Sequence, residues 1–179
     1  MGSSLSRFLA AYEDLFSKST DAPIEFGHAS GLAVLSTIAM RRRWIERGGE
    51  QIHPNLFMLL CADSSRDRKS TSVKLATSML KGHATERTRV GPDNFTPEGL
   101  FTFMIGNVKD GSNKHHEVYL PIGEFGVFLS HASGHSKNLY SEMCNMYDGA
   151  DIVKARAKES FTIENPLVTI FGGVAYGML

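Results

Sequence analysis

A short apolar run, followed by a polar loop and a helix start, constrains this chain more than any other feature. Residues 55–62 read Asn-Leu-Phe-Met-Leu-Leu-Cys-Ala and come directly after Pro54. A nearly continuous apolar run of this length is typical of a strand buried on both faces, as in a parallel sheet. The polar residues 63–68 follow, and the apolar spacing over residues 69–81 predicts a helix that ends at Gly82.

The rest of the chain alternates between helix-like and strand-like segments, which argues for an α/β fold with a mostly parallel sheet. Residues 1–50 are expected to form an N-terminal helical extension that ends at the chain break Gly48-Gly49, and residues 51–179 the α/β core. Thr96 is the expected cap of a helix that starts at Pro97. The remaining predicted elements are helices at 4–18, 24–43 and 139–147, strands at 85–90, 118–122 and 167–171, and a hairpin within 152–163.

Composition limits the class of protein. Apolar residues make up 42% and charged residues 21% of the 179 residues, which is typical of one globular domain. Nineteen basic residues balance nineteen acidic ones, so a global basic field for nucleic acid is absent. No apolar run approaches the roughly 20 residues that a membrane span needs, so no membrane partner is expected. Cys61 and Cys144 lie in apolar sequence and are expected to be reduced and buried in a cytoplasmic protein.

The loop between the first buried strand and its helix carries the candidate chemistry. A phosphate-binding P-loop reads G-x-x-x-x-G-K-[ST], in which backbone N–H groups and a helix N-terminus hold phosphates, the lysine adds charge and the hydroxyl holds Mg²⁺. Lys69-Ser70 ends the loop here, but Asp63 and Arg68 stand at the two glycine positions. The strand-loop-helix context still predicts a site for ATP and Mg²⁺, with Ser70 as the Mg²⁺ ligand. The alternative is an exposed loop whose lysine is solvated. The expected nucleotide-binding residues are Asp63, Ser64, Ser65, Arg66, Asp67, Arg68, Lys69, Ser70 and Thr71.

A second segment supplies a candidate acid. The apolar residues 118–122 precede Gly123-Glu124, in the manner of a Walker B strand. In that motif an Asp helps to hold Mg²⁺, and a following Glu acts on the attacking water. Gly123 occupies the Asp position and only Glu124 remains, so Glu124 and Lys69 are the predicted catalytic residues. The alternative for Glu124 is a surface residue at a strand end.

Several segments in order resemble the helicase-like P-loop ATPase domains that phages, plasmids and other mobile elements encode, often beside primase modules. The resemblance spans nearly the whole chain and rests on residues 33–43, 54–57, 68–71, 123–126, 147–149 and 165–167. It implies a RecA-like core and ATP-driven work on single-stranded or duplex DNA, within an oligomer or larger assembly. By position, it implies that Lys69 and Ser70 bind phosphate and Mg²⁺ and that Glu124 is the catalytic acid.

The chain departs from the pattern of that family at Asp63, at Gly123 and after the strand 167–171, where no polar sensor residue is evident. Family members continue with further strands and an arginine finger, so the resemblance implies a domain that is incomplete at its C-terminus. Two other functions therefore stay open. One is a non-hydrolysing module that binds a nucleotide or nucleic acid, and the other is a partner-dependent structural part of a larger assembly.

Two further groups of residues have competing interpretations. His131 and His135, with Cys144, come nearest to a zinc ligand set, but residues 132–134 predict a loop, and loop histidines are the preferred interpretation. Residues 41–43 are arginines followed by Trp44, which suits single-stranded nucleic acid. They also suit the C-terminus of a helix, where cations are stabilising, and this second interpretation is favoured.

Overall fold

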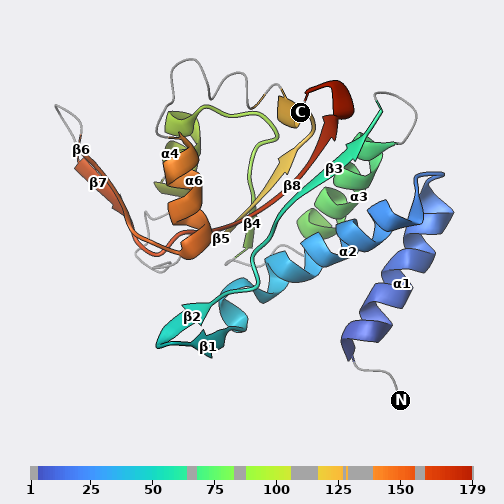
Figure 1. Ribbon diagram of the computed structural model, residues 1–179, viewed down its shortest axis with the longest axis horizontal. Coiled ribbons are helices and arrows are strands. Elements are labelled where there is room, and N and C mark those ends of the chain that lie inside the picture. Colours follow the sequence, from blue (N-terminus) through green and yellow to red (C-terminus); the bar gives the residue numbers. More distant parts are fainter. Residues whose placement is uncertain are drawn as a thin grey trace.

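The computed structural model describes residues 4–63, 68–82, 88–105, 117–126, 128, 139–155 and 160–178 (Figure 1). Its helices are α1 (Ser4–Ser19), α2 (Ile24–Ala39), α3 (Lys69–Gly82), α4 (Pro97–Ile105) and α6 (Leu139–Asp148), with 3-10 turns at Met40–Arg42 and Tyr176–Met178. Its strands are β1 (Ile45–Arg47), β2 (Glu50–Ile52), β3 (Phe57–Ala62), β4 (Thr88–Val90), β5 (Glu117–Ile122), β6 (Ile152–Ala155), β7 (Ser160–Ile163) and β8 (Leu167–Ala175). Within this part of the chain, no helix combines the length and the apolar character that crossing a membrane requires.

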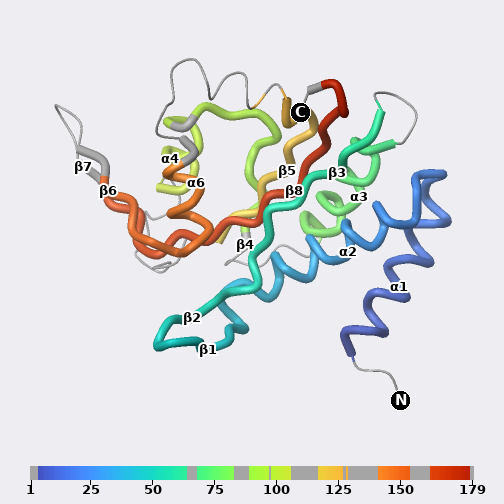
Figure 2. The backbone as a smooth tube through the Cα atoms, in the orientation of Figure 1, coloured from blue at the N-terminus to red at the C-terminus, as the bar shows by residue number. Residues whose placement is uncertain are grey.

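A four-stranded parallel sheet in the order β3-β8-β5-β4 forms the centre of the fold, which confirms the predicted α/β class. β8 lies between β3 and β5, and the trace in Figure 2 shows the three strands side by side. Ala62 pairs with Ala175, and Ile122 pairs with Gly172. Because all four strands run the same way, the segments that follow β3 and β5 leave the same edge of the sheet.

Helices cover both faces of this sheet (Figure 1). One face packs against α1, α2 and α3, and its buried core is Tyr12, Phe16, Ala33, Val34, Leu60, Val73, Ala76, Leu80, Tyr119 and Phe171. The other face packs against α4, α6 and the β6–β7 hairpin, and its buried core is Leu100, Phe101, Met104, Val118, Leu120, Ile122, Phe128, Met143, Met146, Ile152, Ile163, Val168 and Ile170. α1 and α2 thus share a core with α3, and the boundary predicted at residue 50 falls at the start of β2.

Buried hydroxyl groups connect the three helices of the first layer. The Tyr12 hydroxyl lies 2.6 Å from Ser30 Oγ, and Ser30 Oγ donates to the Ser72 carbonyl at 3.2 Å. Ser36 Oγ lies 2.9 Å from Thr169 Oγ1 of β8. Buried polar groups are costly unless they are hydrogen-bonded, so these contacts fix how α1 and α2 sit on α3 and the sheet.

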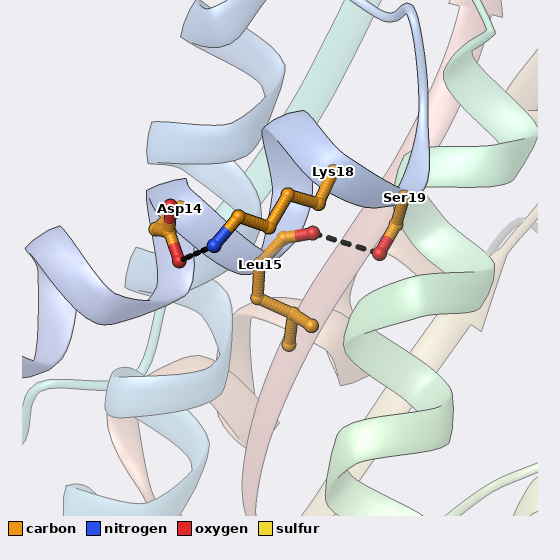
Figure 3. Close-up of polar contacts among 4 residues, drawn as sticks. All are labelled: Asp14, Leu15, Lys18 and Ser19. Atoms are coloured by element: carbon orange, nitrogen blue, oxygen red, sulfur yellow. Dashed lines mark hydrogen bonds and ion pairs between the residues drawn. The ribbon is translucent and has the colours of Figure 1, made fainter.

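Two local contacts lie in the last turns of α1 (Figure 3). Lys18 Nζ lies 2.6 Å from Asp14 Oδ2, one helical turn earlier, and both side chains are mostly exposed. The Ser19 hydroxyl donates to the Leu15 carbonyl at 2.7 Å, which satisfies an acceptor at the end of the helix. An exposed pair of this kind contributes about 0.3–0.5 kcal/mol, so Lys18 and Asp14 are suitable positions for control substitutions.

α4 begins as the sequence predicts. Thr96 Oγ1 accepts the Gly99 N–H at 3.1 Å, and the Thr96 carbonyl accepts the Leu100 N–H at 2.9 Å. Thr96→Ala is expected to lower the free energy of unfolding by about 1 kcal/mol, because it removes an N-cap. Thr102→Ala in the same helix is the control, since the Thr102 hydroxyl donates to the Glu98 carbonyl of its own helix and caps no N–H group, and alanine is the better helix former. Denaturant unfolding measures both variants, and equal losses of stability would contradict the capping role.

Three sequence expectations need correction. Gly48-Gly49 does not end a helical extension but forms the two-residue turn of the β1–β2 hairpin. Both glycines have positive φ, as such turns require. β8 does not stop at Phe171 but continues to Ala175. Cys144 is exposed, because Met143 and Met146 take the core-facing side of α6, and Cys61 of β3 is only partly buried.

Candidate phosphate-binding site

Lys69, the first residue of α3, is a buried cation at the carboxyl edge of the sheet. The residue is 8% exposed, and its Nζ donates to the carbonyl oxygens of Ala62 at 2.9 Å and Asp63 at 2.7 Å. Lys69 is therefore not the solvated lysine of the alternative interpretation. An ammonium group has three N–H donors, so these two bonds, which are the ones made within the described part of the chain, leave one donor for a ligand.

Arg68 stands at the second glycine position of the P-loop pattern and adopts a backbone conformation that suits glycine. Its φ is 54°, in the left-handed region, which costs a non-glycine residue about 1–2 kcal/mol. Its carbonyl accepts the N–H groups of Thr71 and Ser72 at 3.0 and 3.1 Å and so starts α3. Its guanidinium Nε lies 3.0 Å from Asp21 Oδ1, in the α1–α2 connection. The Arg68 guanidinium therefore forms an ion pair with Asp21 in this structure, whereas the sequence predicts Arg68 among the nucleotide-binding residues.

The structure brings Ser70 together with the end of β5. Ser70 and Gly123 line the same groove, whereas Glu124 is exposed at this edge and is not among the residues of that lining. The Glu124 carbonyl accepts the Phe128 N–H at 3.3 Å, which turns the chain away from β5. Because β8 separates β3 from β5, the ends of these two strands lie two strand spacings apart, or roughly 10 Å.

Gly172 and Gly173 of β8 are part of the site, although the sequence analysis did not select them. A Cβ atom on Gly172 would lie 2.7 Å from the Ile122 carbonyl oxygen. A Cβ atom on Gly173 would lie 3.1 Å from the Lys69 Cβ and 3.3 Å from the Gly123 carbonyl oxygen. The glycine pair lets β5 and the Lys69 side chain approach β8 closely. Glycines inside a strand often mark such an approach, and this signal could have found them.

A groove of about 500 Å³ extends from Ser70 along α3, and we call it the α3–β5 groove. Its lining residues are Ser70, Val73, Lys74, Thr77, Ser78, Lys81, Gly91, Pro92, Asp93, Pro121 and Gly123. Asp93 is the carboxylate among the described residues of this lining, and the sequence analysis did not select it. The groove joins the start of α3 to the end of β5, which are the two elements that the P-loop hypothesis requires at one place.

Several predicted residues lie outside the part of the chain that the structure describes. These are Ser64, Ser65, Arg66 and Asp67 of the loop, together with His131 and His135 of the zinc alternative. Among the described residues, no group of three or more His, Cys, Asp or Glu side chains could hold a metal ion. The zinc alternative therefore gains no support from these residues.

The arginines at the end of α2 bond carbonyl groups of the protein, one at the helix terminus and one in the β7–β8 connection. Arg42 Nη1 donates to the Ile38 carbonyl in the last turn of α2, and Arg41 Nη2 donates to the Asn165 carbonyl. Burial lowers the pKa of Arg41, and the nearby Glu117 carboxylate opposes that shift. These contacts favour a structural role for Arg41 and Arg42 over a nucleic-acid patch, while the Trp44 side chain remains about half exposed.

Comparison with known proteins does not assign the chain to a family. No protein-family model matches it, and a search of the curated proteins finds no match.

Proposed function

We propose that the chain binds ATP with Mg²⁺ at the start of α3 and hydrolyses it. The observation that carries this proposal is the position of Lys69, which is buried, held by two carbonyl groups at the end of β3, and has a donor to spare. A surface lysine without a ligand has no reason to be confined in this way, because confinement costs side-chain entropy and desolvation.

Each proposed role follows from the chemistry of the residue. The first two N–H groups of α3, those of Lys69 and Ser70, are not bonded by the Arg68 carbonyl, which accepts from Thr71 and Ser72. With the helix dipole, these two N–H groups favour an anion. Lys69 adds charge to the terminal phosphates. Mg²⁺ sites of this type need only one or two protein oxygens beside phosphate and water, and the exposed Ser70 hydroxyl fits that need. Mg²⁺ would neutralise phosphate charge, and Glu124 would orient the attacking water from across the roughly 10 Å between the strand ends.

We also propose that this core is RecA-like and belongs to a helicase-like replication protein that acts on DNA. The support is the order of the parallel sheet, in which β8 lies between β3, the strand before the proposed phosphate loop, and β5, the strand before Glu124. The resemblance to mobile-element ATPase domains supports it as well. β3 is an edge strand in the described sheet, and an edge of this kind suits a larger assembly that covers it. The free thiols of Cys61 and Cys144 are consistent with a cytoplasmic location.

A second candidate function is nucleotide binding without hydrolysis. It is favoured by Gly123, which stands where a Walker B strand has its Asp. The Cβ position of Gly123 has no atom within 4 Å, so space for a carboxylate exists but no carboxylate fills it.

The test is titration calorimetry of ATP with Mg²⁺ into the full chain, followed by measurement of phosphate release. Saturable binding with Mg²⁺-dependent turnover would support the ATPase. Binding without turnover would support the second candidate. Absence of binding by a demonstrably folded sample would contradict both.

Gly123→Asp is expected to tighten Mg²⁺-dependent ATP binding by about tenfold, which corresponds to about 1.4 kcal/mol. The reason is that the new carboxylate enters open space beside Ser70 without a clash. Gly82→Asp is the matched control, because it adds the same charge in open space at the other end of α3. Calorimetry with and without Mg²⁺ measures both variants. Equal effects at the two positions would contradict a Mg²⁺ site at Ser70.

A further inference from the structure

The α3–β5 groove exists because β4 is shorter than β5. Val90, the last residue of β4, pairs with Tyr119, and the next N–H, that of Gly91, donates to the Tyr119 carbonyl at 2.8 Å. β5 continues to Ile122, so its second half has no described strand beside it on this side. Pro121 lies in that half and has no N–H to leave unpaired, which is how strand edges tolerate proline. The open edge of β5 becomes the floor of the groove.

One face of α3 forms a polar and cationic wall. Ser70, Lys74, Thr77, Ser78 and Lys81 follow one another at helical spacing and all line the groove. Lys74 and Lys81 are exposed, and in the described part of the chain no carboxylate forms an ion pair with either. Asp93 is the one carboxylate among the described residues of the lining. Two ammonium groups against one carboxylate favour an anionic ligand.

The dimensions narrow the class of ligand. Lys74 and Lys81 are separated by seven residues, or about 10 Å along the helix axis. Three hydroxyl groups, those of Ser70, Thr77 and Ser78, lie on the same wall. The volume of about 500 Å³ lies in the range of small-molecule sites. Among the described residues, no aromatic side chain lines the groove, which argues against a single-stranded nucleic acid, since such strands stack on aromatic rings.

We propose that the α3–β5 groove binds a small hydroxyl-bearing molecule with two phosphate groups about 10 Å apart, the spacing that seven helical residues span. One phosphate pairs with Lys74 near the start of α3, the other pairs with Lys81, and the hydroxyl groups bond the serine and threonine side chains. This site goes beyond the proposed nucleotide site and shares only Ser70 and Gly123 with it. Lys69 lies outside the lining, so the two sites can be separated by substitution.

The experiment uses fructose 1,6-bisphosphate as the probe, because it carries two phosphates on a short hydroxyl-bearing chain. Titration calorimetry measures its binding to the full chain, to the double variant Lys74→Gln/Lys81→Gln, and to Lys18→Gln. Lys18 is the matched control, since it is an exposed lysine on α1 that pairs with Asp14 (Figure 3). The expected result is saturable binding to the wild type and the control, and at least about tenfold weaker binding to the double variant.

Two outcomes would overturn the proposal. One is absence of probe binding, or equal probe binding by the wild type and the double variant, in samples that circular dichroism shows to be folded. The other is tighter binding of a single-stranded oligonucleotide than of fructose 1,6-bisphosphate to the wild type, with oligonucleotide binding weakened in the double variant, which would assign the groove to nucleic acid. Binding of fructose 1,6-bisphosphate is measured without ATP, so a chain that does not bind ATP can still bind the probe, and the reverse. The two proposals can therefore fail independently. ATP affinity is expected to be unchanged in the double variant.

Discussion

Lys69→Met is expected to weaken ATP binding by at least about 100-fold, which corresponds to about 2.7 kcal/mol. The size of the effect follows from the loss of a buried, charge-assisted donor, for which costs of about 2–5 kcal/mol are usual. Methionine is chosen because its length and apolar character preserve the stem that passes Gly173. Titration calorimetry with Mg²⁺ and ATP measures the change.

The substitution also removes two hydrogen bonds from the protein itself. The carbonyl groups of Ala62 and Asp63 lose their Lys69 donor, so the free energy of unfolding is expected to fall by about 1–3 kcal/mol. A denaturation curve must therefore accompany the titration. Lys18→Met is the control and should change neither quantity by more than about 0.5 kcal/mol, since the Lys18–Asp14 pair is exposed. Retained ATP affinity in a folded Lys69→Met sample would show that Lys69 does not contact phosphate.

Gly172→Val is expected to lower the free energy of unfolding by about 3 kcal/mol or more, at the upper end of overpacking effects. A Cβ atom at this position would lie 2.7 Å from the Ile122 carbonyl oxygen and 3.2 Å from the Ile122 Cβ. The nearest atom belongs to the backbone of a central strand, so it cannot move aside without separating β5 from β8. Such a loss is a large fraction of the roughly 5–15 kcal/mol that stabilises a typical protein.

Gly177→Val tests whether the effect of Gly172→Val comes from the close approach. Its Cβ position has no atom within 4 Å, so the same chemical change there should alter stability by less than about 1 kcal/mol. Urea denaturation of the two variants gives the comparison. A Gly172→Val protein as stable as the wild type would mean that β5 and β8 do not pack as described.

Local patterns in the sequence were sufficient to predict most elements of the fold. The apolar run of β3, the helical spacing of α3, the cap at Thr96 and the β6–β7 hairpin are all confirmed. The β1–β2 hairpin was missed although its Gly-Gly turn is a recognised hairpin signal. The strand order could not be predicted, because periodicity reports which face of a strand is buried but not which distant strand lies beside it.

The candidate site was predictable only in part. The pattern of an apolar strand followed by Lys69-Ser70 identified the loop, and an apolar strand followed by an acid identified the end of β5. The burial of Lys69 depends on Gly173, the carbonyl groups that hold Lys69 belong to the strand end, and Arg68 is paired with Asp21 of another connection. The Gly173 and Asp21 contacts join residues that are distant in sequence, so no local motif reveals them. The bonds from Lys69 to the strand end are local, but a sequence pattern does not show that the side chain folds back onto these carbonyl groups. The α3–β5 groove forms because β4 is shorter than β5, and the sequence pattern does not determine where β4 stops pairing with β5.

The most direct test of the central claim is an amide NMR titration of the ¹⁵N-labelled wild-type chain with Mg²⁺ and ATP. If phosphates bind at the start of α3, the largest shift changes fall on the N–H groups of Lys69, Ser70 and Thr71, with a further change at Gly123. A well-dispersed spectrum that does not change, or that changes only at residues remote from this edge of the sheet, would contradict a phosphate site at Lys69.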